Sequence, residues 1–377
     1  MNNSALQEYA AAVWPEAARI VRDLCRIPAP SHHEEKRAEY CRKWFEDQGF
    51  KNVCIDPALN VIAPVNVTSN NDLLVVMAHT DTVFPDTEPM PVTEDENFIY
   101  APGVTDDTAN LAVLMVCSRY YKEHLPENSP GVLFVANSCE EGLGNLKGCR
   151  QIFADYGERI REFVSLDSAV MNRLVTNAVG SHRYQVTVRT EGGHSFSQFG
   201  NRNAIAVLAT LINFLYTVKV PVNGNSQTTY NVGGISGGTS VNTIAQSAEM
   251  LYEYRSTDRS CLKKMQQIFN NAITALRSTG AAVEVQLLGE RPCSGEIDPE
   301  RFEKLKKRYY QAAGKVLDLP LTERSASTDC NIPLSLGVPA ICFGTCRGSG
   351  VHTREEKLET ASLQDGCHLL LEFLYQQ

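Results

Sequence analysis

Several features that mark particular classes of protein are missing from this sequence. No segment approaches the ~18 consecutive apolar residues that a membrane-spanning helix needs. The opening residues contain no basic segment followed by an apolar core, which a secretory signal would have. With 35 Lys and Arg against 44 Asp and Glu, the formal net charge is −9, and no basic run is present to neutralise phosphates. We therefore expect a cytoplasmic protein that binds neither membranes nor nucleic acid.

Paired cysteine motifs are missing as well. The 12 cysteines are scattered, often inside apolar segments, as at Cys117 and Cys342. No two of them form a Cys-x-x-Cys pair. In a chain of this size without a secretory signal, this pattern predicts reduced, mostly buried thiols and argues against a zinc site made of cysteine.

Length and composition describe an ordinary globular protein. The chain has 377 residues, more than the ~250–300 at which single hydrophobic cores stop growing, so two domains are expected. Hydrophobic residues make up 43% and charged residues 21% of the sequence, as in typical soluble proteins.

Two helices are predicted near the N-terminus. Residues 5–27 carry apolar side chains at helical spacing, with Pro15 as the point at which we expect a kink or a restart. Ser31 and Glu34 fit a capping box for a second helix that runs to about Gln48.

The most informative stretch is an apolar strand that ends in a histidine. Residues 73–78 are continuously apolar and rich in valine, which predicts a buried strand. The strand is followed by His79-Thr80-Asp81. An imidazole is well oriented as a metal ligand when an acceptor, such as a nearby carboxylate, holds its second nitrogen. The plainer interpretation is a strand end that becomes polar where it meets water.

The same arrangement recurs along the chain. Apolar segments at 132–136, 162–166 and 338–343 are followed by acidic residues or a histidine, and two aspartates precede a predicted helix at 108–117. These polar residues are Asp106, Asp107, Glu140, Glu141, Asp167 and His352. Because the carboxyl ends of strands in β-α units face a common crevice, we expect these side chains to converge. Two histidines with several carboxylates and no cysteine match a divalent site such as zinc, manganese or cobalt. Plain helix capping would need only one of the two aspartates.

The order of the predicted strands and helices changes in the middle of the chain. Between about residues 181 and 290, strands and helices are predicted in the order β-α-β-β-α-β, which indicates a small inserted α+β (ferredoxin-like) domain. We therefore expect an α/β domain made of residues 1–180 and 291–377, interrupted by the insert at 181–290.

These motifs and their order resemble a known family. It is the family of two-metal zinc peptidases and deacylases that includes peptidase T, carboxypeptidase G, aminoacylase and succinyl-diaminopimelate desuccinylase. The resemblance covers essentially the whole chain and is nearest to peptidase T-like members. It implies a mixed-sheet α/β catalytic domain with helices on both faces, an inserted lid or dimerisation domain, and two divalent metal ions per subunit, with zinc expected first.

The resemblance also implies roles for single residues. The metal ligands would be His79, Asp106, Glu141, Asp167 and His352, with Asp106 bridging both metals. Asp81 would stand behind His79, and Glu140 would act as the general base. Two positions depart from the family pattern: Thr108 stands where many members have Lys or Gly, and Ser327-Thr328-Asp329 matches a polar motif only loosely. Neither departure touches an expected ligand, so they bear on the substrate and not on the metal site.

The insert carries three further expected site residues. By resemblance His194, which follows two glycines, would reach the substrate together with Asn242 and Arg255, and the insert would form a homodimer. The competing interpretations are a histidine in a surface loop and a solvated arginine at a strand end. Whether His194 serves its own site or that of a partner stays open at this point.

The sequence therefore predicts a metal-dependent hydrolase that cleaves an amide bond in small peptides, as a di- or tripeptidase or exopeptidase. Glu140 would accept a proton from water held at the two metals and pass it to the amine that leaves. An N-acyl-amino-acid deacylase of the acetyl or succinyl type would use the same centre and is the alternative. A catalytically silent binding protein is a rival from another class, but the complete set of ligands together with Glu140 argues against it.

Overall fold

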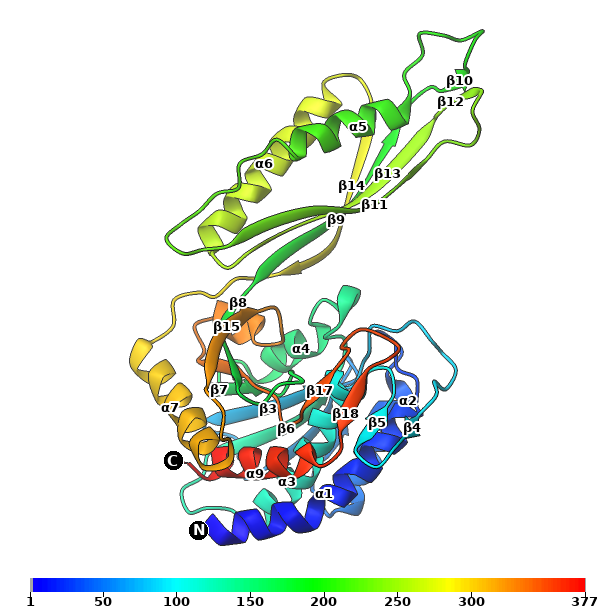
Figure 1. Ribbon diagram of the computed structural model, residues 1–377. Helices are drawn as coiled ribbons and strands as arrows, with labels where there is room; N and C mark the ends of the chain where they lie inside the picture. The colour runs from blue at the N-terminus through cyan, green and yellow to red at the C-terminus, as the bar shows by residue number, and fades with distance from the viewer. Residues whose placement is uncertain (1–2, 377) are drawn as a thin grey trace. The chain divides into compact units, whose positions relative to one another are not determined.

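An eight-stranded mixed sheet runs through the larger of the two units into which the chain divides (Figure 1). The computed structural model describes residues 3–376. The larger unit comprises Met1–Ala178 and Gly295–Gln377, and the second unit comprises Val179–Ser294. The insert expected at 181–290 falls inside this second unit.

The order of the strands in the large sheet is β1-β2-β6-β3-β7-β16-β8-β15. Their bounds are β1 Cys54–Ile55, β2 Val61–Val65, β3 Leu73–His79, β6 Gly131–Asn137, β7 Ile160–Ser165, β8 Arg173–Ala178, β15 Thr322–Ala326 and β16 Ala340–Cys342. Strand β3 pairs in parallel with both β6 and β7, and β16 pairs in parallel with β7. By contrast, β2 and β8 run antiparallel to their neighbours β6 and β16. The carboxyl ends of β3, β6, β7 and β16 therefore meet at one edge of the sheet.

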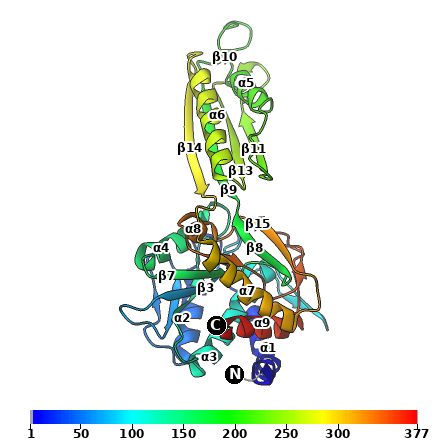
Figure 2. The same ribbon diagram turned by 90° about the vertical axis from the view of Figure 1, so that its left-hand side faces the viewer.

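Helices cover both faces of this sheet (Figures 1 and 2). One face carries α1 Asn3–Cys25, α2 Glu35–Asp47, α3 Ala109–Glu123, α7 Pro299–Val316 and α9 Ser362–Tyr375, and the other carries α4 Lys147–Tyr156 and α8 Asn331–Ser335. Alternate residues of β3 serve the two cores: Leu74 and Val76 pack with the first group, and Val75 and Met77 pack with the second. The predicted α/β domain, with a mixed sheet and helices on both faces, is confirmed. Within residues 3–376, no helix has the length and apolar character needed to cross a membrane.

A small sheet supports two loops that face the same edge. It consists of β4 Thr93–Glu94, β5 Phe98–Tyr100, β17 Gly348–Ser349 and β18 Lys357–Glu359, in the order β17-β18-β5-β4. Strand β5 leads into the turn at 101–108, and β17 and β18 enclose the loop at 350–356. The pairing of β18 with β5 thus brings together two loops that are far apart in the sequence.

The N-terminal helices differ from the sequence prediction. Helix α1 continues through Pro15 as a single helix. The predicted capping box is wrong, because the N-cap residue of α2 is Glu34 and its side chain makes no capping hydrogen bond. Ser31 does not cap the helix either: its hydroxyl donates to Asp81 Oδ2 at 2.6 Å. Both side chains turn towards the loops that follow β3 and β6.

The second unit has the predicted β-α-β-β-α-β order, and its ferredoxin-like arrangement is confirmed (Figure 2). Its elements are β9 Gly180–Arg189, α5 Ala204–Leu215, β11 Thr228–Gly237, β13 Ser247–Ser256, α6 Arg259–Arg277 and β14 Ala282–Arg291. The sheet has the order β11-β13-β9-β14, and α5 and α6 share one hydrophobic core with its strands. Two short strands, β10 Gly193–His194 and β12 Thr243–Ile244, form a separate ribbon.

Candidate metal centre

The end of β3 places a buried histidine at the edge of the large sheet. His79 is 1% exposed, and its Nε2 lies 3.0 Å from Asp106 Oδ1. Its Nδ1 lies 3.0 Å from the backbone oxygen of Asp81 and 3.4 Å from the carboxylate of that residue. The backbone N–H of His79 donates to Asp107 Oδ2 at 2.9 Å. Asp81 therefore holds the Nδ1 nitrogen of His79, as expected for a metal-binding imidazole, while the Nε2 nitrogen faces Asp106.

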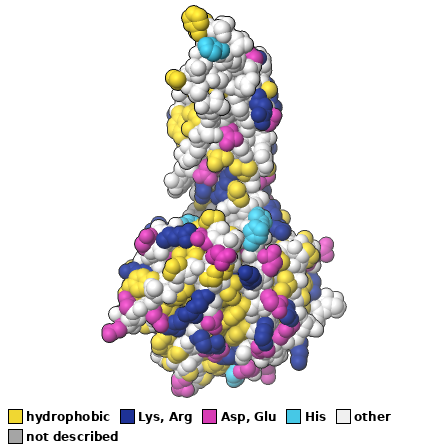
Figure 3. Space-filling view, turned by 90° about the vertical axis from the view of Figure 1, so that its right-hand side faces the viewer, with side chains coloured by type: hydrophobic (Ala, Val, Ile, Leu, Met, Phe, Trp, Pro, Cys, Tyr) yellow, Lys and Arg dark blue, Asp and Glu magenta, His cyan; other side chains and the backbone are white. Residues whose placement is uncertain are grey.

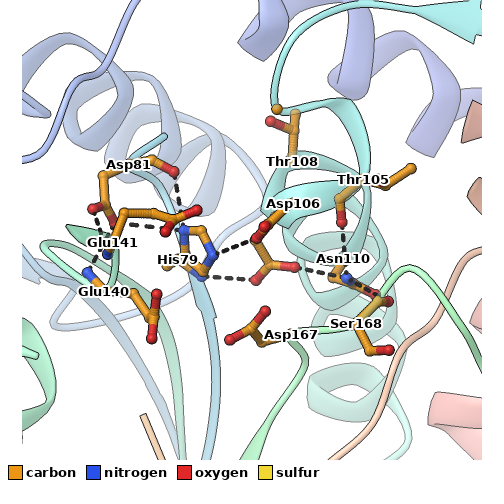
Figure 4. A network of polar contacts seen from close by, with 12 residues as sticks. His79, Asp81, Thr105, Asp106, Thr108, Asn110, Glu140, Glu141, Asp167 and Ser168 are labelled. Atoms are coloured by element: carbon orange, nitrogen blue, oxygen red, sulfur yellow. Dashed lines mark hydrogen bonds and ion pairs between the residues drawn. The ribbon is translucent and has the colours of Figure 1, made fainter. Parts of the chain in front are cut away.

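The turn before α3 places Asp106 between two histidines, and Figure 4 shows Asp106 beside one of them, His79. While Oδ1 contacts His79, Oδ2 lies 3.0 Å from His352 Nε2. Neither aspartate of the Asp106-Asp107 pair caps the helix, because the N-cap of α3 is Thr108 and it accepts no capping hydrogen bond. The capping explanation is therefore excluded.

A buried glutamate from the loop between β17 and β18 holds the turn that carries Asp106. Glu356 accepts hydrogen bonds from the backbone N–H groups of Gly103 at 2.9 Å, Thr105 at 2.7 Å and Asp106 at 3.1 Å. The three donors fix the backbone, so the Asp106 side chain projects from a rigid turn.

The two consecutive glutamates lie in a loop beyond β6, which ends at Asn137. Cys139 has a φ of 57°, in the left-handed region that ends an extended strand. The loop is held by Asp81, whose two carboxylate oxygens accept the backbone N–H groups of Glu140 at 3.0 Å and of Glu141 at 2.9 Å. Because the chain has left the strand, both glutamate side chains can face one site, and both are buried. Glu141 Oε1 lies 3.2 Å from His352 Nε2.

Carboxylates crowd together in this site. Two sets of three residues offer ligand atoms that all lie within 4.8 Å of one another, namely His79, Asp106 and Glu141, and His79, Glu140 and Asp167. Burial and the charge of Asp106 raise the pKa of Asp167 to about 7. Burial, with the charges of Asp167 and Asp106, also raises the pKa of Asp107 well above its ordinary range.

The two histidines supply only part of the positive charge that these carboxylates need. Hydrogen bonds to Asp106 and Glu141 raise the pKa of His352 to about 10. Carboxylates that repel one another in a dehydrated site favour a bound cation. Imidazole nitrogens and carboxylate oxygens are the donors that zinc and similar divalent ions take. The residues present therefore fit divalent metal, and His79, Asp106, Glu140, Glu141, Asp167 and His352 converge as expected from the sequence.

The three expected substrate residues of the insert do not lie together. His194 pairs with Thr243 across the β10–β12 ribbon, and the backbone N–H of Ser195 donates to the backbone oxygen of Asn242 at 3.0 Å. His194 and Asn242 are thus neighbours. Arg255 lies near the other end of β13, where its guanidinium binds both oxygens of Glu253 at 3.0 and 3.1 Å. About eight residues of strand, or roughly 27 Å, separate the start of β13 from Arg255.

The sequence did not identify some residues that support the site. Glu356 is simply an acidic residue in a polar loop, and its burial follows from the pairing of β18 with β5. Asp329, from the loosely matching Ser327-Thr328-Asp329 segment, is buried and accepts a hydrogen bond from Asn137 Nδ2 at 2.7 Å. The spacing of Ser31 and Glu34 assigned Glu34 to a helix cap, whereas its side chain contacts Cys139 in a distant segment. Such a contact leaves no local pattern in the sequence.

Comparisons with known proteins identify one family and one fold. Residues 75–376 match the model described as Peptidase family M20/M25/M40. Over 372 residues the chain is 21% identical to succinyl-diaminopimelate desuccinylase of Corynebacterium glutamicum, covering 94% of this chain and 95% of that protein. The fold of this chain is similar to that of aminopeptidase PepT from Bacillus cereus, with a TM-score of 0.73 and 21% identity, and the match covers 96% of this chain and 98% of that chain. It is also similar to the YxeP protein of Bacillus subtilis, a dinuclear metal binding peptidase, with a TM-score of 0.67, 15% identity and coverage of 97% and 98%.

Proposed function

We propose a specific activity for this chain, which belongs to peptidase family M20/M25/M40 and is a metal-dependent hydrolase. It cleaves the amide bond next to a free amino acid in small peptides. The observation that carries this proposal is the position of Asp106, which contacts one histidine through each carboxylate oxygen beside the Glu140-Glu141 pair.

The same contacts suggest which residues hold the metals. We assign His79 and Asp167 to one ion, Glu141 and His352 to the other, and Asp106 to both. The contacts of Asp106 with each histidine and of Glu141 with His352 support this division. Two divalent ions held there, with zinc the first candidate, would supply positive charge to polarise the substrate carbonyl and to acidify a water molecule.

Glu140 is then the residue that moves the proton. Its carboxylate accepts a proton from the water whose oxygen attacks the carbonyl carbon. As the carbon–nitrogen bond breaks, Glu140 gives this proton to the amine nitrogen, so that a carboxylic acid and an amine leave. Burial of Glu140 and the fixing of its backbone by Asp81 support the assignment, because a general base must be held within hydrogen-bond reach of its proton.

Asp81 supports both the His79 ring and the loop that carries Glu140. Burial opposes its ionisation, but hydrogen bonds, first from His79 and then from Ser31 and the Glu141 N–H, lower the pKa of Asp81 below its ordinary value. An ionised Asp81 accepts hydrogen bonds from the catalytic loop and keeps the His79 ring oriented.

The insert supplies the proposed contacts with the substrate. Arg255 would bind a free substrate carboxylate through two parallel hydrogen bonds, and His194 and Asn242 would bind the scissile amide. One small substrate cannot touch both ends of β13 in a single copy, since the strand separates them by roughly 27 Å. We therefore place His194 and Asn242 in the site of a second copy of the chain.

Exposed hydrophobic side chains support a homodimer. Phe196 is 88%, Phe199 90% and Val241 102% exposed, and all three flank His194 or Asn242 in the sequence. Figure 3 shows hydrophobic side chains beside a histidine at the end of the unit that carries β10. Large apolar side chains that cluster in full contact with water mark an interaction site.

The alternative substrate is an N-acyl amino acid. The desuccinylase relative, whose alignment covers 94% of this chain, favours this candidate. The same centre would hydrolyse the amide bond of an N-acyl amino acid. Metal content and turnover, measured together, separate the two. The panel contains di- and tripeptides, acetyl- and succinyl-amino acids, each with and without a chelator.

We expect about two divalent ions per chain and peptide cleavage that the chelator stops. Cleavage of acylated amino acids alone would keep the mechanism and replace the substrate. Bound metal without turnover on either set would reject both substrates. A protein that binds no metal after reconstitution would reject the centre itself.

A further inference from the structure

The first turn of α2 and the residues before it bury two opposite charges. Glu34 and Arg37 are each 0% exposed, whereas Glu35 and Lys36, between them, are exposed. Residues three apart lie on the same face of a helix. Burial of a charged side chain costs free energy unless hydrogen bonds compensate it, and helix capping does not account for Glu34. Their contacts therefore identify what these two charges do.

Glu34 supports the loop that follows β6. Its Oε1 accepts hydrogen bonds from the Cys139 backbone N–H at 3.0 Å and from the Cys139 thiol at 3.3 Å. Cys139 has a φ of 57° and directly precedes Glu140. A residue other than glycine adopts this conformation only where its surroundings stabilise it. Glu34 supplies that support and thereby sets the direction in which the glutamate pair leaves the strand.

Arg37 supports the two other loops of the site. Its Nη1 donates to the Thr80 backbone oxygen at 2.9 Å and to Thr108 Oγ1 at 3.2 Å. Thr80 lies between His79 and Asp81, and Thr108 closes the turn that carries Asp106. Its Nε donates to the Ile27 backbone oxygen at 2.8 Å, which anchors the guanidinium to the segment that follows α1.

Ser31 completes the set. Its hydroxyl lies 2.6 Å from Asp81 Oδ2 and 3.3 Å from the Glu141 backbone oxygen. The Asp81 carboxylate that binds the N–H groups of the catalytic loop is therefore itself oriented from the segment before α2.

We propose that Ser31, Glu34 and Arg37, which we call the α2 clamp, are positioning residues for the metal centre. Their hydrogen bonds go to residues beside the proposed ligands or to backbone groups, and not to the ligand side chains. They act through Asp81, Cys139, Thr80 and Thr108, each of which lies within two residues of a proposed ligand, on three loops that are separate in the sequence. The start of α2 and the segment before it thus fix the relative positions of His79, Asp106 and the glutamate pair.

The inference rests on the proposed function, because a clamp needs a metal centre to hold. Its test measures metal affinity, which does not depend on the substrate. Zn²⁺ affinity is determined by competition with a chromophoric chelator for the full chain and for the variants Ser31→Ala, Glu34→Ala and Arg37→Met. Glu35→Ala and Lys36→Met are the matched controls, since they remove the same charges from exposed neighbours in the same helix turn.

Supporting side chains beyond the ligands typically contribute 10–100-fold to metal affinity or activity. We expect a loss of roughly this size in Zn²⁺ affinity for Glu34→Ala and Arg37→Met, and a smaller loss for Ser31→Ala. Glu34→Gln keeps an oxygen acceptor for the Cys139 N–H and should recover most of the affinity. Circular dichroism shows which variants are folded, and affinities are compared among the folded variants only.

Three results would overturn the clamp. They are wild-type affinity in folded Glu34→Ala and Ser31→Ala, an equal loss in Glu35→Ala, and the absence of rescue by Glu34→Gln. If the wild-type chain binds Zn²⁺ but cleaves no peptide, the proposed substrate fails while the comparison of affinities still decides the clamp. If the wild-type chain binds no Zn²⁺, both proposals fail together.

Discussion

The Oδ1 atom of Asp81 accepts a hydrogen bond from the backbone N–H of Glu140 at 3.0 Å. The carboxylate that lies behind a histidine on one strand thus also holds the loop at the end of the neighbouring strand. A single side chain couples the orientation of His79 to the position of Glu140. Disturbing it should affect both metal binding and catalysis.

Replacement of Asp81 by Asn tests this coupling. The amide has one acceptor oxygen, and its NH₂ group would oppose a backbone N–H donor, so one of the two loop hydrogen bonds is lost. We expect a fall of roughly 10–100-fold in kcat/KM or in metal affinity, measured by steady-state kinetics and chelator competition. Asp72→Asn is the control, because Asp72 directly precedes β3, at the end of the strand opposite His79, and forms an ion pair with Arg161 at 3.0 Å. Wild-type values for Asp81→Asn would contradict the coupling.

Replacing the two neighbouring glutamates, Glu140 and Glu141, should affect turnover and metal binding differently. Glu140→Ala should retain both metal ions and lose roughly 10²–10⁴-fold in kcat, because a general base is removed. Glu141→Ala should lose metal, because Glu141 contacts His352 in the proposed ligand set. Metal analysis of each purified variant, together with its turnover, distinguishes the two. Equal metal loss in both would show that Glu140 is a ligand, as its place beside His79 and Asp167 would also allow.

Arg255 should discriminate between free and blocked substrates. If its guanidinium binds the substrate carboxylate, Arg255→Met removes charged hydrogen bonds and raises KM roughly ten- to hundredfold for peptides with a free C-terminus. Amidated peptides should show little change. Arg189→Met is the matched control, since Arg189 lies in the same sheet and pairs with Glu284. A uniform rise in KM for both substrate types would reject the carboxylate contact.

Mixing of inactive subunits tests whether His194 serves a second copy. Glu140→Ala and His194→Ala should each be inactive as homodimers. In a mixed dimer, the His194→Ala subunit keeps Glu140 and the Glu140→Ala subunit keeps His194, so one site becomes complete if His194 acts across the interface. We expect activity to reappear after co-refolding of the two variants. No recovery, with mixed dimers demonstrated by differential tagging, would place His194 in its own site.

Asp258 should contribute stability that depends on pH. A hydrogen bond from Ser260 and then the backbone N–H of Cys261 lower its pKa to about 2, from 3.8. Because the folded-state pKa is depressed, the contribution is complete well above pH 3.8 and disappears as the pH falls towards 2. As the N-cap of α6, Asp258 should contribute about 1 kcal/mol at pH 7.

Urea denaturation of the wild type and of Asp258→Ala measures this effect. The difference in the free energy of unfolding should shrink as the pH falls from about 5 towards 2. Asp258→Asn, which retains an acceptor and does not titrate, should keep its stability over that interval. A difference between Asp258→Ala and the wild type that is independent of pH would contradict the assignment.

Much of the architecture followed from local patterns. The continuous apolar run at 73–78 indicates a strand buried on both faces, and β3 is buried along its whole length. Alternating strands and helices in the insert predict its ferredoxin-like unit, which the structure has. Periodicity reports burial directly, so such elements can be read from one sequence. The capping box at Ser31 and Glu34 misled, because the spacing of a cap does not show whether the side chains face the helix or the interior.

The sequence by itself determined which side chains end the strands of the large sheet and therefore which chemistry was available, because parallel strands deliver their carboxyl ends to one edge. Only the tertiary structure decided that Asp106 contacts two histidines, that Asp81 holds the loop of Glu140, and that Glu34 and Arg37 are buried behind them. These contacts join segments far apart in the chain. Their geometry depends on packing between elements, and no local pattern of residues encodes it.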